Sequence, residues 1–203
     1  MNIRERLLSN TFVYKTFKSL VSPPAMERKT INEFLNVADN SKVLDLGCGY
    51  GDIARFFVNR CQYVGVDSNV GYINEAKRRN AGTNAEFIVA DITDTQVHEK
   101  GPFDLVFLSG VLHHLTSEQV SSIAETAKSL VAPSGRMVAI EPVFAPDQRL
   151  SARLIIASDR GRYVRDAAGY TNLLRSGFEN IEADVVHGRL RIPYSHVILT
   201  CRH

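Results

Sequence analysis

The chain has few cysteines and no long apolar run, and both absences narrow its class. Its 203 residues include Cys48, Cys61 and Cys201, an odd set whose spacing fits neither a disulfide framework nor a zinc site. No stretch approaches the ~20 apolar residues that a membrane-spanning helix needs, and no apolar signal segment follows the N-terminus. These features predict a soluble, cytoplasmic protein without a metal site or a membrane span.

A strong excess of charge of one sign is also missing. The formal net charge is +2, which gives no electrostatic reason to expect a nucleic-acid or membrane partner. Residues 1–30 are locally basic, with six basic and two acidic side chains. Such a segment is typical of a solvated helix face, and contact with an anionic partner is the alternative.

What the chain does contain is a regular alternation of element types. Hydrophobic residues make up 44% of the chain, enough to bury the core of a single domain over residues 1–203. Short apolar runs predict buried strands, and segments with helical apolar spacing lie between them. The predicted strands span 42–47, 63–67, 86–91, 103–109 and 137–141, and the predicted helices span 52–59, 70–80 and 117–131. This order predicts a Rossmann-like α/β fold, with a parallel sheet and helices on both faces.

The C-terminal part departs from this alternation. Two further apolar runs, 181–186 and 196–201, are separated by a gap too short for a crossover helix, so they predict an antiparallel hairpin. The complete prediction is therefore a seven-stranded, mostly parallel sheet. Helices are predicted at 148–158 and 166–176, and an insertion at about 143–166 is expected to act as a lid over the strand ends.

The N-terminal segment, residues 1–37, is predicted to form a helical cap on a core that spans 38–203. It carries an approximate apolar stripe and is interrupted by Pro23-Pro24. We expect the stripe to pack against the domain's own strand ends, and binding to a membrane surface is the alternative.

The main chemical signal is the glycine-rich segment from Asp45 to Gly51, Asp-Leu-Gly-Cys-Gly-Tyr-Gly, after the first predicted strand. Ligands of open parallel sheets bind at the carboxyl ends of strands, where glycines let them approach the backbone closely. A dinucleotide fingerprint requires glycine or alanine at position 52, where this chain has Asp52. Because Asp45 and Asp52 would repel a pyrophosphate, the loop favours a cationic ligand.

The segment from Val43 to Gly51 resembles the first motif of class I S-adenosylmethionine-dependent methyltransferases of the small-molecule type. This resemblance implies S-adenosylmethionine as cofactor and S-adenosylhomocysteine as product. It also implies that Asp67 binds the ribose and Asp91 the adenine amine, which agrees with their positions at the ends of two successive predicted strands. The implied cofactor-binding residues are Asp45, Gly47, Cys48, Gly49, Tyr50, Gly51, Asp67, Ser68, Asp91, Ile92, Ser109 and Gly110.

The segment from Leu108 to Leu115 resembles the family's fourth motif in members that act on small molecules. It lacks the Asp/Asn/Ser-Pro-Pro-aromatic sequence of nucleic-acid amine methyltransferases, which argues against a nucleic-acid partner. His114, and after it His113, is a candidate general base, because an imidazole titrates near neutral pH. Glu141 is a candidate for binding or deprotonating the acceptor. The alternatives are a loop-orienting role for the histidines and a capping or ion-paired role for Glu141.

Candidate acceptor-binding residues lie in the predicted cap and lid. Tyr14 belongs to the cap, and the arginines and tyrosine of the lid suit a carboxylate or phosphate, namely Arg160, Arg162 and Tyr163. Tyr194 and His187 are further candidates for the cavity wall. The predicted activity is methyl transfer to an oxygen, nitrogen or carbon nucleophile of a small-molecule acceptor, such as a sugar, lipid or natural-product intermediate. The alternatives are an RNA or protein methyltransferase, an inactive cofactor-binding partner subunit and a dinucleotide oxidoreductase.

Overall fold

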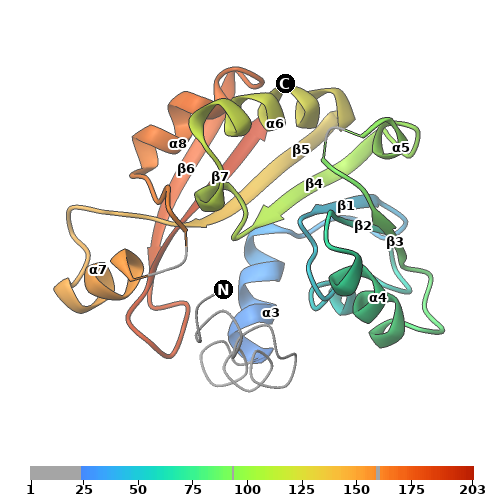
Figure 1. Cartoon of the computed structure of the whole chain (residues 1–203), viewed down its shortest axis with the longest axis horizontal. Coiled ribbons are helices and arrows are strands. Elements are labelled where there is room, and N and C mark those ends of the chain that lie inside the picture. Colours follow the sequence, from blue (N-terminus) through green and yellow to red (C-terminus); the bar gives the residue numbers. More distant parts are fainter. Residues whose placement is uncertain (1–23, 93, 159–160) are drawn as a thin grey trace.

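The structure, a computed structural model, describes residues 24–92, 94–158 and 161–203, and it contains one seven-stranded sheet (Figure 1). The strand order is β3-β2-β1-β4-β5-β7-β6. Only β7 runs antiparallel to its neighbours, β5 and β6. The strands are β1 (Lys42–Leu46), β2 (Gln62–Asp67), β3 (Glu86–Val89), β4 (Phe103–Ser109), β5 (Val131–Pro142), β6 (Asn180–His187) and β7 (Ser195–Arg202). The predicted Rossmann-like sheet and its C-terminal antiparallel hairpin are confirmed.

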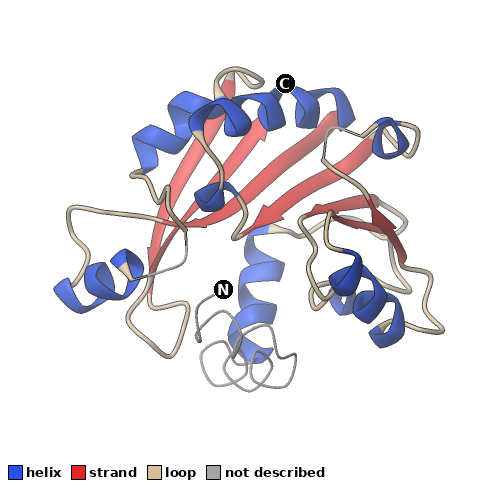
Figure 2. Cartoon of the chain, viewed as in Figure 1, coloured by secondary structure: helices blue, strands red, loops and turns tan. Residues whose placement is uncertain are grey.

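Helices cover both faces of this sheet, as predicted (Figure 2). One face carries α6 (Ser117–Leu130) and α8 (Ala167–Leu174), and the other carries α3 (Pro24–Phe34) and α4 (Val70–Arg79). The remaining described helices are short: α5 (Thr95–His98), α7 (Leu150–Ala157) and the 3₁₀ turns η1 (Ala54–Phe56) and η2 (Leu112–His114). None of the helices in the described ranges is long and apolar enough to cross a membrane.

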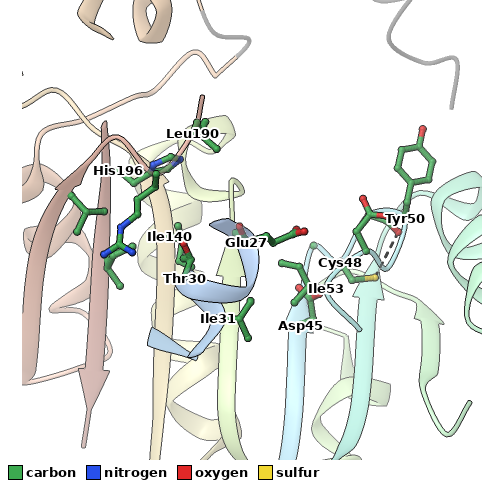
Figure 3. Close-up of a pocket in the computed structure, with 17 residues that line it drawn as sticks. Glu27, Thr30, Ile31, Asp45, Cys48, Tyr50, Ile53, Ile140, Leu190 and His196 are labelled. Atoms are coloured by element: carbon green, nitrogen blue, oxygen red, sulfur yellow. Dashed lines mark hydrogen bonds between the residues drawn. The ribbon is translucent and has the colours of Figure 1, made fainter. Parts of the chain in front are cut away.

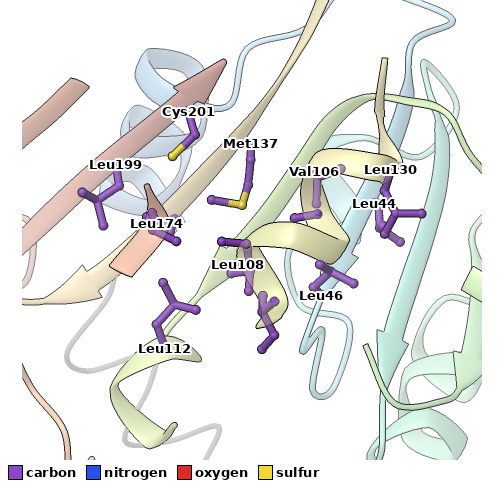
Figure 4. Close-up of a cluster of buried hydrophobic side chains, with 14 of the residues drawn as sticks. Leu44, Leu46, Val106, Leu108, Leu112, Leu130, Met137, Leu174, Leu199 and Cys201 are labelled. Atoms are coloured by element: carbon purple, nitrogen blue, oxygen red, sulfur yellow. The ribbon is translucent and has the colours of Figure 1, made fainter. Parts of the chain in front are cut away.

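The core has two layers, because successive residues of a strand point to opposite faces of the sheet. Leu44 and Leu46 of β1 pack toward α6 and α8 in the cluster of Figure 4, whereas Val43 packs toward α3 and α4. The central strands are apolar on both faces, as expected for strands that are covered on both sides. Burial on both faces makes β1 and β4 a rigid base for the loops that follow them.

Two predicted elements differ from the structure. The helix predicted at 52–59 is only the 3₁₀ turn η1 followed by turns, and Asn59 adopts a left-handed conformation (φ 69°) that directs the chain into β2. Because Ala54 and Phe57 are three residues apart, the tighter turn buries them together as well as an α-helix would. The fifth strand starts at Val131 rather than 137, since Val131 pairs with Phe103 before a register shift.

The predicted start of the helix at 117 is confirmed in detail. Thr116 accepts a hydrogen bond from the Gln119 backbone N–H, and the Gln119 side chain accepts one from the Thr116 N–H, which forms a capping box. Of the predicted N-terminal cap, residues 1–23 lie outside the described residues. Its described part, α3, packs on the sheet through Ile31 and Leu35.

Candidate functional site

The glycine loop turns sharply at the carboxyl end of β1 and is held against β2. The backbone N–H groups of Gly47 and Cys48 both donate to the carbonyl oxygen of Val66, at 2.8 and 2.9 Å. Gly47 has a φ of 78°, and a Cβ there would lie 2.6 Å from Cγ2 of Val111. At Gly49 (φ 53°) a Cβ would meet no atom within 4 Å, because this residue faces open space. The loop thus presents bare backbone to the carboxyl edge of the sheet.

Asp67, the last residue of β2, is fixed against this loop. Its Oδ2 accepts a hydrogen bond from the Gly49 N–H at 3.0 Å, and its Oδ1 accepts one from the Asn69 N–H at 2.8 Å. Each carboxylate oxygen can accept a further hydrogen bond. The side chain is therefore oriented by the backbone and still able to accept from a pair of ligand hydroxyls.

A large cavity of about 1160 Å³ opens beside this loop. It is lined by residues that follow four successive parallel strands, together with α6, α7 and the β6–β7 loop. Most of the sequence-predicted site residues meet there: Gly47, Gly49, Asp67, Ser68, Asp91, Ile92, Ser109, Gly110, His113 and His114. The structure thus brings together side chains that are up to 67 positions apart in the sequence, from Gly47 to His114.

A smaller cavity of about 280 Å³ lies on the α3 face of the loop (Figure 3). The predicted residues Asp45, Cys48 and Tyr50 line this smaller cavity and not the larger one. The two cavities share Gly47, Gly49, Ser109, Ile140, Leu190 and His196, so they are continuous around the glycine loop. Gly51 lines neither, because its Cα packs against the Phe87 ring, which a Cβ would approach to 2.8 Å.

The acids of the loop have partners within the protein. Asp45 is buried and accepts a hydrogen bond from the Tyr63 hydroxyl at 2.5 Å. Burial, and then the nearby Asp45 charge, raise the pKa of Tyr63 well above its usual range, so the phenol stays protonated and keeps donating. Asp52 does not act as the sequence reasoning assumed, because its carboxylate pairs with Arg79 at 2.6 Å. Its attraction for a cationic ligand is therefore offset.

Burial also raises the pKa of Cys48, followed by the effects of the Asp45 and Asp67 charges. The thiol is therefore neutral at physiological pH and serves as a small packing group in the loop. No cluster of three or more histidine, cysteine, aspartate or glutamate side chains suited to a metal occurs within the described ranges.

The contacts of Glu141 differ from those expected of a residue that binds or deprotonates the acceptor. Glu141 is fully buried and lines neither cavity. Its Oε1 accepts from the N–H groups of Val111 and Leu112 at 2.9 and 2.8 Å, and its Oε2 lies 3.3 Å from the His113 N and 2.7 Å from His113 Nδ1. This acid holds the turn after β4 in place, and its contacts favour the capping or ion-paired alternative over binding or deprotonating the acceptor.

The two histidines have different environments. His113 is only 5% exposed and is held by Glu141 on one side, while the Gly161 backbone packs against its ring so closely that a Cβ there would lie 1.9 Å from Cδ2. His114 is exposed and lines the larger cavity. The centroids of the His113 and His114 rings are 4.0 Å apart. Of the two, His114 is better placed to contact an acceptor.

The predicted acceptor-binding residues of the cap and lid are only partly described by the structure. Arg162 and Tyr163 are exposed and line neither cavity, and Tyr14 and Arg160 lie outside the described residues. Arg165 has the structural role in this segment, since its guanidinium donates to the carbonyl oxygens of Leu112 and Leu115 at 3.3 and 2.9 Å. It supports the same turn that Glu141 holds from the other side.

Residues of the β6–β7 loop complete both cavities, and sequence reasoning found only part of them. Tyr194 lines the larger cavity as predicted, whereas His187 lines neither and contacts Ser195 and Asp147. The missed residues are Arg189, Leu190, Ile192 and His196. The predicted hairpin could have indicated them, because a last strand that runs antiparallel begins at the edge of the sheet where the parallel strands end. Residues just before and at the start of β7 therefore lie near the glycine loop's edge of the sheet.

The fold and the site define a Rossmann-like domain that holds a small ligand at the carboxyl edge of its sheet. Residues 43–135 match the methyltransferase domain family. The chain is 35% identical to (S)-coclaurine N-methyltransferase of Papaver somniferum over 43% of this chain and 26% of that protein. It is 26% identical to phosphoethanolamine N-methyltransferase 1 of Zea mays over 77% of this chain and 32% of that protein.

The chain therefore spans about a third or less of the length of these curated relatives. Among solved structures, the S-adenosylmethionine-dependent methyltransferase SibL in its apo form has a TM-score of 0.72 at 20% identity, covering 98% of this chain and 61% of that one. Residues 43–135 thus match a methyltransferase domain, and the whole chain has the fold of a known S-adenosylmethionine-dependent methyltransferase.

Proposed function

We propose that this protein binds S-adenosylmethionine in the joined cavities and transfers its methyl group to a nitrogen nucleophile of a small-molecule acceptor. The observation that carries the proposal is the set of acids and glycines after β1, β2, β3 and β4 around one cavity of about 1160 Å³. A cavity of this size is large for one small molecule and suits a nucleoside together with an acceptor.

The residues present fit the cofactor part by part. Gly49 leaves open space where any other residue would place a Cβ, so an amino-acid group can lie against the loop backbone. Asp67, oriented by two backbone N–H groups, suits a pair of ribose hydroxyls. Asp91 suits the adenine amine, and Ile92 beside it covers an aromatic ring. Asp45 and Ser109 line the cavity where the methionine part would lie.

When bound, S-adenosylmethionine supplies an electrophilic methyl group on a sulfonium that leaves without further activation. The protein then has to align the nucleophile, exclude water and accept a proton. The turn Leu112–His114 contributes His113 and His114 to the wall of the larger cavity and is fixed by Glu141 and Arg165. His114, at the end of this turn, is the candidate for accepting the acceptor's proton.

Nitrogen is favoured over oxygen or carbon by the names of the curated relatives, which are N-methyltransferases of (S)-coclaurine and of phosphoethanolamine. A neutral amine needs little help from a general base, since it is a good nucleophile before it loses a proton. This suits a site in which one histidine is committed to Glu141 and only His114 is exposed.

The proposal is tested first by calorimetry with S-adenosylhomocysteine and then by transfer of labelled methyl groups to pools of small amines. We expect Asp67→Ala to weaken S-adenosylhomocysteine binding by about tenfold or more, because it removes the ribose acceptor and an anchor of the loop. Asp184→Ala is the matched control, since Asp184 is exposed on β6 and lines neither cavity.

Two results would contradict the proposal. One is equal affinity for S-adenosylhomocysteine in the wild type and Asp67→Ala, and the other is tighter binding of NAD than of S-adenosylhomocysteine. Cofactor binding without transfer to any amine pool would instead favour an oxygen or carbon acceptor or an inactive partner subunit. Transfer to RNA that falls steeply with added salt would favour a nucleic-acid acceptor.

A further inference from the structure

The β6–β7 loop places a partly satisfied arginine in the wall of the smaller cavity. Nη2 of Arg189 donates to Oε1 of Glu33 at 2.8 Å, and the guanidinium lies 5.5 Å from the centroid of the Phe34 ring. Nη1 is buried and has no hydrogen-bond partner within the described part of the chain. A buried charged donor without an acceptor is unfavourable, so this nitrogen is suited to receive an oxygen atom of a ligand.

The other charged groups around this cavity do not combine an unsatisfied buried donor with a place in its wall. Its three acids each have a partner, Asp45 in Tyr63, Asp52 in Arg79 and Glu27 in Arg55. Arg60 and Arg79 also contain a buried nitrogen without a hydrogen-bond partner among the described residues, but neither side chain lines a cavity. Arg189 alone among the described residues combines an unsatisfied buried donor with a position in a cavity wall.

The ion pair with Glu33 does not prevent Arg189 from binding an anion. The Glu33 side chain is 42% exposed, so solvent screens its charge and its attraction for the guanidinium is modest. Its geometric effect is larger, because it holds Nη2 and leaves Nη1 without a hydrogen-bond partner on a side chain that lines the cavity. Planar guanidinium edges of this kind bind carboxylates and phosphates through paired hydrogen bonds.

The position of Arg189 indicates which part of a bound complex it would meet. In the sheet order β1-β4-β5-β7-β6, four strand spacings separate the glycine loop from the end of β6, roughly 19 Å at ~4.8 Å each. Leu190 and His196 lie on the opposite side of the smaller cavity from Asp45, Cys48 and Tyr50 (Figure 3). An amino-acid group held on the glycine loop is therefore on the far side of the cavity from Arg189.

We propose that Arg189 binds an anionic group, a carboxylate or a phosphate, carried by the methyl acceptor. The inference rests on the proposed function, because it assumes that the glycine loop holds S-adenosylmethionine. His196 lines both cavities and adds a polar side chain on the side of Leu190 (Figure 3). The acceptor class is then a small amine that carries an anion at the end away from its nucleophilic nitrogen.

The test uses the full chain saturated with S-adenosylhomocysteine and inorganic phosphate as the probe anion. Phosphate is titrated while the arginine side-chain NMR signals are followed, in the wild type, Arg189→Met, Arg189→Lys and the control Arg191→Met. Arg191 is an exposed neighbour in the same loop and lines neither cavity. We expect saturable binding in the wild type and Arg191→Met, and binding about tenfold weaker or more in Arg189→Met.

Arg189→Lys keeps the charge without the planar edge, so we expect phosphate affinity between those of the wild type and Arg189→Met. All variants should bind S-adenosylhomocysteine as the wild type does. Unsaturable phosphate binding in the wild type, or equal phosphate affinity in Arg189→Met, would overturn the inference.

The cofactor's carboxylate is the other source of an anion, and a second comparison separates it. If Arg189→Met binds S-adenosylhomocysteine about tenfold more weakly but binds 5′-methylthioadenosine, which lacks the amino-acid group, as tightly as the wild type, Arg189 serves the cofactor and the assignment to the acceptor is wrong. Failure of the proposed function itself is distinct, because the wild-type chain would then not bind S-adenosylhomocysteine.

Discussion

Replacing Glu141 tests how the turn after β4 is held. Its carboxylate is fully buried and accepts from the backbone N–H groups of Val111, Leu112 and His113 and contacts the His113 ring at Nδ1. Glu141→Ala leaves all of these donors without an acceptor. Because an unsatisfied buried donor costs roughly 1–3 kcal/mol, and water from the adjacent cavity reaches some of them, we expect a loss of about 4 kcal/mol in the free energy of unfolding.

Glu141→Gln separates the acceptor role from the charge. The amide oxygen of the glutamine can still accept from the N–H groups of Val111 and Leu112. Its amide nitrogen, which is a donor, then faces the His113 backbone N–H, which is also a donor. We expect a loss of about 2 kcal/mol, half of that in Glu141→Ala. Since domains of this kind are stable by about 5–15 kcal/mol, both variants should fold.

The assay is urea unfolding at neutral pH, with hydrogen exchange of the Val111 and Leu112 amides as a local readout. Glu179→Ala is the control, because Glu179 is exposed in the turn before β6. A loss below about 1 kcal/mol in Glu141→Ala, with unchanged protection of those two amides, would refute the reasoning. Both variants should also weaken S-adenosylhomocysteine binding, since the turn forms part of the larger cavity.

Two further predictions follow from the loop and the buried thiols. Gly49→Ala should cost about 1 kcal/mol in stability and abolish S-adenosylhomocysteine binding by calorimetry, whereas Gly82→Ala, at a similar left-handed position (φ 82°) in open space, should cost the same and leave binding intact. Burial raises the pKa of Cys201 to about 12 from 9.0, so the folded state keeps a proton that the unfolded state loses above pH 9. The urea midpoint should therefore fall as pH rises from 9 toward 12, and Cys201→Ala should reduce that fall; an equal fall in both would argue against the assignment.

The sheet could be predicted from the sequence because its strands are buried on both faces and are therefore continuous apolar runs. The positions of Asp67 and Asp91 at the carboxyl edge of the sheet could be predicted for a related reason, since each comes at the end of such a run. The roles of Asp52 and Glu141 could not be predicted. Each role depends on a partner distant in sequence, Arg79 for Asp52 and the turn at Val111 for Glu141. The sequence around an acid does not indicate whether such a distant partner will meet it in the fold.

The acceptor side was harder to predict for a topological reason. The glycine loop and the two acids come from parallel strands, so their positions follow from counting strand ends. Arg189 and His196 come from the hairpin, where the position of a residue depends on the register between β7 and β5, in which His196 lies opposite Pro142. A one-residue change in that register would move His196 to the other face of the sheet.

This difference in topology also has a consequence for specificity. The residues that suit the cofactor lie on rigid, doubly buried strands, whereas those proposed for the acceptor lie on a loop whose neighbours are α3 and the segment carrying α7. We therefore expect substitution of Arg189 to alter acceptor binding without disturbing Asp67, because Arg189 bonds to Glu33 of α3 whereas Asp67 bonds to the Gly49 N–H. Arg189 and Asp67 are then expected to behave independently, with additive effects of Arg189→Met and Asp67→Ala on stability and separate effects on the two ligands.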